Sequence, residues 1–223
     1  MIERFSHSKG NLLDVGCGAG FFLNYANSKG WDVNGIDLLD EYIQFAKEKL
    51  MIKNVHCLSL EEAHFDEQFF DVVTLWDLIE HLPKPLQELK KINRLLKPGG
   101  HLAIWTPNVK NSIFMKENWT GYITYQHLYF FSLKTLEQLL KRAGFKIVFS
   151  KTNKAKKGLL IPKKSLKFKE FKKPKSTIGR FWFSAKRDLK NLINPMTYMD
   201  PLFNAAGYGF NLLIIAEKDS NNH

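Results

Sequence analysis

Three glycines at alternate positions, Gly16, Gly18 and Gly20, form the part of this sequence best suited to holding a ligand. A short apolar run precedes them and an amphipathic segment follows, which predicts a strand, a tight turn and a helix. Glycine lets the backbone approach a ligand closely, where a Cβ atom would clash. The acidic Asp14 stands two residues before the first glycine. The G-x-G-x-G spacing differs from the G-x-G-x-x-G of dinucleotide-binding enzymes, and a purely structural turn is the alternative.

A second acidic residue, Asp37, ends the next predicted strand, 17 positions after Gly20. The carboxyl ends of parallel strands meet at one edge of a sheet, where ligands bind. A carboxylate at this place can accept hydrogen bonds from both hydroxyls of a ribose. Its structural alternative, capping the following helix, suits Asp40 better.

Two histidines, His81 and His127, are candidates for proton transfer. His81 follows Glu80 after the fourth predicted strand, and His127 follows the fifth within a segment rich in aromatic residues. Histidine is the usual general base when the acceptor of a reaction is a hydroxyl group. A packing or helix-capping role remains the alternative for both histidines.

The predicted elements explain how these residues would come together. Strands are expected at 12–15, 31–36, 55–60, 70–75, 101–105, 145–150 and 208–217, and helices at 21–29, 41–50, 85–96 and 132–143. Alternation of strands and helices at this rhythm predicts a parallel α/β sheet with right-handed crossovers. The helix at 85–96 is expected to stop at Pro98-Gly99-Gly100, before the fifth strand.

Length and composition suit one domain with an appendage, or two small domains, among 223 residues. No apolar run reaches the roughly 18 residues of a membrane span, and residues 1–10 lack the apolar core of a signal peptide. The two cysteines, Cys17 and Cys57, are expected to be buried thiols in a reducing compartment, and two are too few for a thiolate zinc site. The expected location is therefore cytoplasmic.

The net charge of +11 belongs entirely to the last third of the chain. Residues 1–150 hold 17 basic and 17 acidic residues, whereas residues 151–223 hold 16 basic and 5 acidic ones. Within that third, apolar residues recur at helical spacing over 178–193, with basic residues on the other side. A basic amphipathic helix suits a membrane surface or an anionic partner, and the alternative is a helix that packs on the domain with a solvated cationic side.

Four segments together resemble the class I S-adenosylmethionine-dependent methyltransferases: Asp14–Gly20 (DVGCGAG), Gly35–Asp37 (GID), Phe70–Asp77 (FDVVTLWD) and Leu96–Gly100 (LKPGG). The likeness covers residues 11–150 and 208–218. Residues 78–85 and 126–132 are similar to the ubiquinone-biosynthesis-type branch, which includes many O-methyltransferases of small molecules and saccharides. The resemblance implies an α/β, doubly wound, mostly parallel seven-stranded sheet with an antiparallel last strand.

The resemblance implies S-adenosylmethionine as the cofactor and a path along which it binds. The methionine part is expected at Asp14 and at the turn made of Gly16, Cys17, Gly18 and Gly20, with Trp76 and Asp77 facing its amino group. Asp37 is expected on the ribose hydroxyls and Leu38 on the adenine face. Ser59 and Leu60 would contact the adenine edge, although many relatives have Asp where Ser59 stands.

Methyl transfer from a sulfonium needs little chemical assistance from the protein, because the leaving group is already good. Alignment of the acceptor with the methyl carbon supplies most of the acceleration. His127 and His81 are the candidate bases for a hydroxyl acceptor. No metal is expected, although Asp77, Glu80 and His81 offer ligands for a divalent cation, as suggested for some relatives.

Two departures from the family define the expected domains. Most relatives carry helices before the first strand, where this sequence has only residues 1–10, and a large insertion separates the last two strands. We expect a cofactor-binding domain of residues 1–150 and 208–218 and a basic insertion of residues 151–207. The helix at 178–193 is expected to close over the site beyond the fifth strand and to face an acidic or membrane-associated acceptor.

The leading hypothesis is O-methylation of a small-molecule, lipid-linked or saccharide-linked acceptor, with peripheral membrane contact through residues 178–193 as an option. RNA methylation is an alternative that the basic appendage permits. Against it, no obvious aromatic platform for bases is present, and no Asn/Asp-Pro-Pro-Tyr motif follows the fourth strand. A binding module that keeps the cofactor pocket without catalysis is the third hypothesis. The oligomeric state is not predicted.

Overall fold

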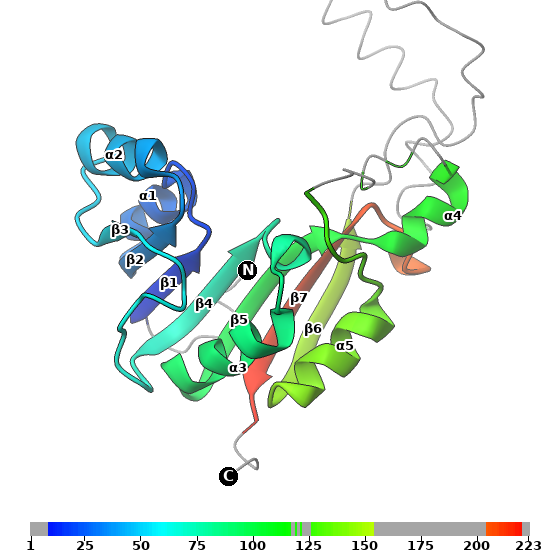
Figure 1. Ribbon diagram of the computed structural model, residues 1–223. Coiled ribbons are helices and arrows are strands. Elements are labelled where there is room, and N and C mark those ends of the chain that lie inside the picture. The colour runs from blue at the N-terminus through cyan, green and yellow to red at the C-terminus, as the bar shows by residue number, and fades with distance from the viewer. Residues whose placement is uncertain (1–8, 117–118, 120, 122–125, 154–203, 220–223) are drawn as a thin grey trace, which may run out of the picture.

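A seven-stranded sheet forms the centre of the computed structural model, which describes residues 9–116, 119, 121, 126–153 and 204–219 (Figure 1). The strand order is β3-β2-β1-β4-β5-β7-β6. Strands β1 to β5 pair in parallel, and β7 is antiparallel to both of its neighbours. The strands are β1 (Asn11–Val15), β2 (Asp32–Asp37), β3 (Val55–Cys57), β4 (Phe70–Trp76), β5 (Leu96–Pro107), β6 (Phe145–Asn153) and β7 (Asn211–Lys218). The predicted fold class is confirmed, including the antiparallel last strand.

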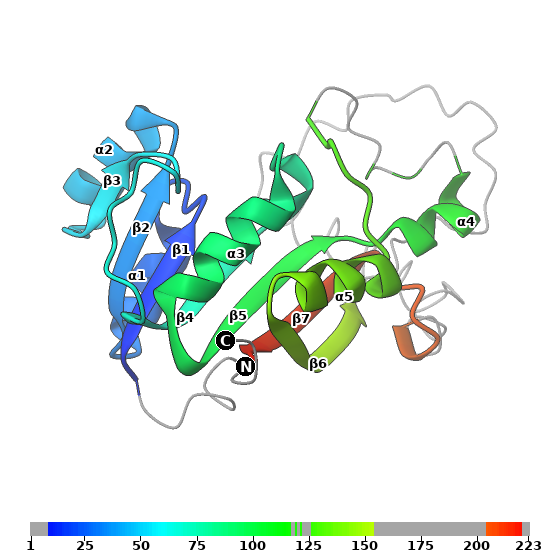
Figure 2. The same cartoon turned by 60° about the horizontal axis from the view of Figure 1, so that its bottom comes forward.

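Helices cover both faces of the sheet, but over different strands. They are α1 (Phe21–Ser28), α2 (Asp40–Lys49), α3 (Pro85–Leu95), α4 (Ser112–Met115) and α5 (Leu133–Arg142), with two short turns of 3-10 helix, η2 (Ile79–His81) and η3 (Val109–Asn111). Figures 1 and 2 show α3 and α5 in front of β4 to β7, and α1 and α2 beside β1 to β3.

Two separate cores follow from the alternation of side chains along each strand. Leu13 faces the core under α3 and α5, whereas its neighbour Leu12 faces the core under α1 and α2. Helix α5 contributes Leu136 and Leu140, four residues apart, and both are fully buried. Its first turn is held by a capping box between Ser132 and Thr135.

Several predicted boundaries were wrong, and two of these differences, at β5 and β3, have a clear local reason. Strand β5 begins at Leu96 and runs through Pro98-Gly99-Gly100, because Leu96 already pairs with Phe70 and the register then shifts. Gly99 supplies the positive φ of 72° that this irregularity needs. Strand β3 ends at Cys57 because Ser59 turns the chain with its own hydrogen bonds, donating its N–H and its hydroxyl to the carboxylate of Glu62.

The proposed insertion of residues 151–207 lies almost entirely outside the described residues. Strand β6 continues to Asn153, three residues beyond the predicted end, and the chain is described again from Asn204. The helix predicted over 178–193 and its expected place beyond the fifth strand therefore stay predictions. Within the described part of the chain, every helix is too short or too polar to cross a bilayer.

Candidate active site

The glycine turn joins β1 to α1 and is held against β2. The N–H groups of Gly16 and Cys17 both donate to the carbonyl oxygen of Ile36, at 2.8 and 3.0 Å. Gly16, Gly18 and Gly20 all have positive φ. A Cβ on Gly20 would lie 2.9 Å from the Cβ of Ala46, whereas a Cβ on Gly18 would meet nothing within 4 Å. Gly20 therefore allows helix packing, and Gly18 borders open space in which a ligand fits.

Asp37, at the end of β2, is tied to the same turn. Its Oδ2 accepts the N–H of Gly18 at 2.8 Å, and its Oδ1 accepts the N–H of Leu39 at 2.9 Å. These bonds fix the orientation of the carboxylate. Because an ionised carboxylate has about four acceptor positions, others remain for outside donors such as hydroxyl groups.

A cavity of about 250 Å³ opens beside Asp37. Five predicted residues line it: Gly16, Asp37, Leu38, Ser59 and Leu60. The N–H and hydroxyl of Ser59 both donate to Glu62, at 2.9 and 2.7 Å, so this residue is already engaged within its own turn. The walls are otherwise mainly apolar, as a flat aromatic ligand requires.

The sequence-based prediction missed the wall that α3 and the preceding segment build. Its residues include Leu78, Leu82, Pro83, Glu88 and Ile92. Burial raises the pKa of Glu88 above its ordinary value, while Lys91 acts in the opposite direction. Glu88 stands in the first turn of α3, where an acidic residue is favoured by the helix dipole, so its type and position in the sequence do not indicate a place in the cavity.

The remaining predicted residues lie outside this cavity, and their contacts with a cofactor stay predictions. Asp14 is 1% exposed and accepts a hydrogen bond from the hydroxyl of Thr74 at 2.5 Å. Trp76 packs on Phe22 with ring centroids 5.0 Å apart and lines a second cavity on the α1 face. Asp77 is exposed and has a φ of 49°, and it turns the chain out of β4.

The buried Asp14 predicts a pH dependence of stability. Burial raises its pKa from 3.8 to about 7, with a smaller increase from Asp37 and a decrease from the Thr74 bond. Between these values the unfolded chain has lost the proton that the folded protein keeps, so stability falls as pH rises. The loss reaches up to about 4 kcal/mol above pH 7. Denaturant titrations at several pH values should show this loss in the native protein and not in the Asp14→Asn variant. A difference between the two proteins that is constant with pH would contradict the assignment.

The two histidines lie together, with ring centroids 4.7 Å apart. Nδ1 of His81 is 2.8 Å from the carbonyl oxygen of Gln126, and Nδ1 of His127 is 2.8 Å from that of Gly121. A carbonyl oxygen only accepts, so both Nδ1 atoms carry the proton in the neutral rings. Each Nε2 then has a free lone pair, which a general base or a metal ligand needs. Burial lowers the pKa of His127, which keeps this ring neutral near pH 7.

Glu80 connects the histidine pair to the sheet. It is 2% exposed, and its Oε2 accepts the hydroxyl of Thr106 at 2.9 Å, while Oε1 has no hydrogen-bond partner among the described residues. Its carbonyl oxygen accepts the N–H groups of Leu128 and Tyr129, at 2.8 and 3.1 Å. These bonds bring the segment after His127 back to η2, the turn that carries His81.

Ligand atoms of Glu80, His81 and His127 all lie within 4.8 Å of one another, a spacing that can hold a cation. From the sequence, the possible ligands of a divalent cation were Asp77, Glu80 and His81. In the structure His127, and not Asp77, forms the group with Glu80 and His81. The chain positions of Glu80 and His127 are 47 apart, and no local motif links them.

A family described as "Methyltransferase domain" matches residues 1–149. The ubiquinone biosynthesis O-methyltransferase of Coxiella burnetii is 36% identical over 112 residues, which cover 48% of this chain and 48% of that protein. The enzyme of the same name from Aliivibrio fischeri is 33% identical over 117 residues, 46% of this chain and 47% of that protein. The match thus spans about half the length of these curated relatives.

Solved structures share the fold. A SAM-dependent methyltransferase from Archaeoglobus fulgidus superimposes with a TM-score of 0.64 at 22% identity, over 97% of this chain and 89% of that one. Phosphoethanolamine N-methyltransferase 2 of Haemonchus contortus, solved in complex with S-adenosyl-L-methionine, gives 0.62 at 22% identity, over 98% and 51%. At these identities the likeness establishes the architecture alone.

Proposed function

This chain belongs to the family of methyltransferase domains, and on that premise we propose that it methylates an oxygen atom of a small-molecule, lipid-linked or saccharide-linked acceptor, with S-adenosylmethionine as cofactor. The observation that carries the proposal is the hydrogen bond from the Gly18 N–H to Asp37, a residue that lines the cavity. It places a fixed carboxylate, a bare backbone turn and an apolar pocket at one edge of the sheet.

The residues at this edge fit the cofactor. Open space over Gly18 accommodates the methionine part of the cofactor, close to the protein backbone. The free acceptor positions of Asp37 suit a pair of ribose hydroxyls, and Leu38 and Leu60 supply apolar walls for a base. When bound, S-adenosylmethionine supplies an electrophilic methyl carbon on a sulfonium.

The protein's own part in the reaction is positioning and proton transfer. Leu78 and Leu82, which precede and follow His81 in the sequence, line the cavity, and this supports a place for the histidine pair beside the cofactor. The Nε2 atom of His127 can take the proton of an acceptor hydroxyl while its Nδ1–H stays bonded to Gly121. His81 packs edge-on against that ring and limits its rotation.

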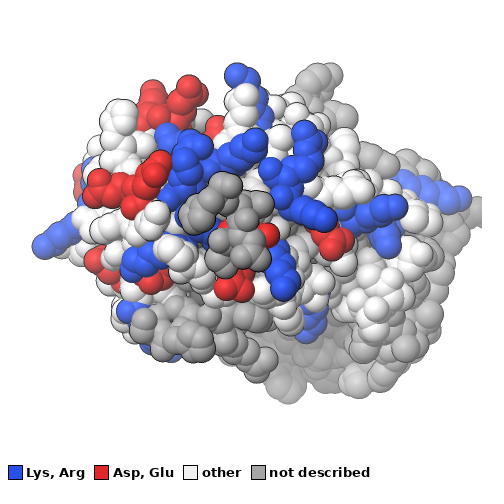
Figure 3. Space-filling view, turned by 90° about the horizontal axis from the view of Figure 1, so that it is seen from below, with Lys and Arg blue, Asp and Glu red and all other residues white. Residues whose placement is uncertain are grey.

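The choice of oxygen is supported by the relatives whose names describe O-methylation. RNA as the acceptor is less well supported. Figure 3 shows lysine and arginine side chains gathering on the side seen from below, where β5 starts and β7 ends. Lys97 and Lys218 lie there, at the edge opposite the glycine turn. Charge at this edge is badly placed to bring a nucleic acid to the methyl group, whereas the basic excess of the last third of the chain lies in residues 154–203, outside the described residues.

Cofactor binding tests the first part of the proposal. Asp37→Ala removes the acceptor for two hydroxyls and also releases the N–H of Gly18, so affinity for S-adenosylhomocysteine should fall at least about tenfold. Titration calorimetry measures this change. Asp40→Ala is the matched control, because it removes the same charge from the exposed start of α2 and should leave affinity unchanged. Equal affinities for a folded Asp37→Ala variant and the native protein would exclude the ribose assignment.

Turnover tests the second part. Formation of S-adenosylhomocysteine should be measured with phenols, saccharides and lipid-linked hydroxyl compounds, and with RNA as a competing class. We expect turnover with a hydroxyl compound. Turnover with RNA alone would favour the alternative substrate, and tight cofactor binding without any turnover would favour a binding module.

A further inference from the structure

One face of the sheet is strongly apolar where no described helix covers it. Residues that pair directly across neighbouring strands share a face, and one such row runs Trp76, Trp105, Leu213 across β4, β5 and β7. The next row contains Ile215 of β7 and its partner Phe149 of β6. We call these five residues the tryptophan face.

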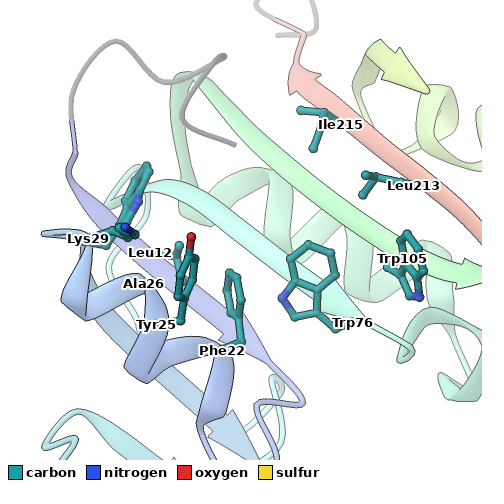
Figure 4. Close-up of a pocket in the computed structure, with 10 residues that line it drawn as sticks. Leu12, Phe22, Tyr25, Ala26, Lys29, Trp76, Trp105, Leu213 and Ile215 are labelled. Carbon is teal, nitrogen blue, oxygen red and sulfur yellow. The ribbon is translucent and has the colours of Figure 1, made fainter. Parts of the chain in front are cut away.

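The tryptophan face is on the same side of the sheet as α1 and α2, but these helices pack over other strands. Both helices pack over β2, and α2 also packs over β3, whereas α3 and α5 occupy the opposite side. Leu213 and Ile215 belong to neither of the two cores. Between α1 and this face lies a cavity of about 270 Å³ whose walls include Phe22, Trp76, Trp105 and Leu213 (Figure 4).

Leu213 and Ile215 are only 7% and 1% exposed, and Trp76 and Trp105 are half-buried, although no described helix packs on them. Apolar side chains of this size gain from leaving water, so this face calls for a cover. The indole N–H of Trp76 is also buried without a hydrogen-bond partner among the described residues. We infer that the tryptophan face is covered by residues 178–193 of this same chain.

The sequence of that segment is the first argument for it as the occupant. Its apolar residues recur at helical spacing, and its basic residues fall on the other side. The apolar set is Ile178, Phe181, Trp182, Ala185, Leu189, Leu192 and Ile193. A helix with this pattern buries its apolar side and leaves its cations in water. Lys29 lines the cavity and Lys151 pairs with Leu213, so these two cations would repel the basic side of the helix and favour the same orientation. Residues 1–8 offer only Met1, Ile2 and Phe5, which are too few to cover it.

The connections of the segment are the second argument. The described chain stops at Asn153 and resumes at Asn204, and the hydroxyl of Thr152 donates to the carbonyl oxygen of Asn204 at 2.7 Å. The residues on either side of 154–203 therefore lie together, where β6 ends and β7 begins, and both strands belong to the tryptophan face. A helix of 16 residues is about 24 Å long, and the strand spacings from β4 to β6 add up to about 14 Å. The segment is long enough to cross the whole face.

A photo-reactive residue at Tyr25 tests the inference in the full-length chain. Tyr25 is 61% exposed and lines the cavity, so p-benzoylphenylalanine at this position keeps an aromatic ring there without disturbing a core. After irradiation, mass spectrometry should find adducts within residues 178–193. The same probe at Tyr42, which is 46% exposed on α2 and outside the cavity, is the control and should give at least about tenfold fewer such adducts, since the probe reacts only at contact distance.

Mixing the probe-bearing chain with an isotopically labelled chain distinguishes the possible occupants. Adducts between the probe and unlabelled residues 178–193, without adducts to the labelled chain, support the inference, because they then form within one molecule. Adducts with the labelled chain would show that a second copy occupies the face, and adducts with residues 1–8 would assign it to the amino-terminal segment. Either result, or equal labelling from Tyr25 and Tyr42, would overturn the inference. The probe at Trp105, in the centre of the face, repeats the measurement independently of α1.

Discussion

Gly18→Val is expected to reduce affinity for S-adenosylmethionine and S-adenosylhomocysteine by at least about a hundredfold, close to 2.7 kcal/mol. A side chain at this position would occupy the open space over the turn, which nothing in the described protein fills within 4 Å. The φ of 51° is also unfavourable for a β-branched residue, so the turn would shift and weaken the bond from the Gly18 N–H to Asp37. Titration calorimetry with both ligands measures the loss.

Backbone strain alone has to be separated from the loss of ligand space. Gly99 is a matched control, because its φ is 72° and a Cβ there would make only an ordinary contact, 3.8 Å from Glu217. It lies at the start of β5, on the edge opposite the glycine turn. Gly99→Val should therefore cost stability, about 1–2 kcal/mol, and leave affinity intact. If both variants bind the cofactor normally, the glycine turn has only a structural role.

The fold was predictable because its signals are local. Apolar runs such as Leu12–Val15 and helical spacing such as Leu136–Leu140 each lie within one element, and their order along the chain fixes the class of sheet. The start of β5 could not be found in this way. Pro98 and two glycines normally end an element, and only the pairing of Leu96 with Phe70 of the neighbouring strand makes this segment part of the sheet.

The candidate site was only half predictable, for the same reason. Asp37 and the glycine turn stand at strand ends, so topology alone brings them together. The meeting of Glu80, His81 and His127 depends on a segment after β5 that returns to η2 through backbone hydrogen bonds, which no spacing in the sequence encodes. The place of Trp76 on the α1 face follows from strand alternation, but the cavity beside it depends on where α1 ends.

The histidine pair raises the question of which ring acts as the base. Both present a free Nε2, but their surroundings differ: burial lowers the pKa of His127, and the segment that carries it is also rich in aromatic side chains. A base that is already neutral at pH 7 is competent without first losing a proton. We therefore expect His127 to take the acceptor proton and His81 to position it.

His127→Ala is accordingly expected to lower kcat for a hydroxyl acceptor by about 10²–10⁴-fold, the usual contribution of a general base. Affinity for S-adenosylhomocysteine should not change, since His127 does not line the cofactor cavity. His64→Ala, a change at an exposed histidine, is the control and should leave both quantities unaltered. His81→Ala should have a smaller effect on kcat and should move the pH profile, because it removes the ring that packs against the base.

The pH profile provides the decisive measurement. In the native protein kcat/KM should rise with pH as His127 loses its proton, with an apparent pKa below the ordinary 6.5, and should be level at neutral pH. NMR titration of the imidazole signals should give the same pKa for His127 without any acceptor present. In His127→Ala the rising limb should disappear together with most of the rate. A limb that persists unchanged in His127→Ala, but vanishes in His81→Ala, would reverse the two roles, because the proton would then pass to Nε2 of His81.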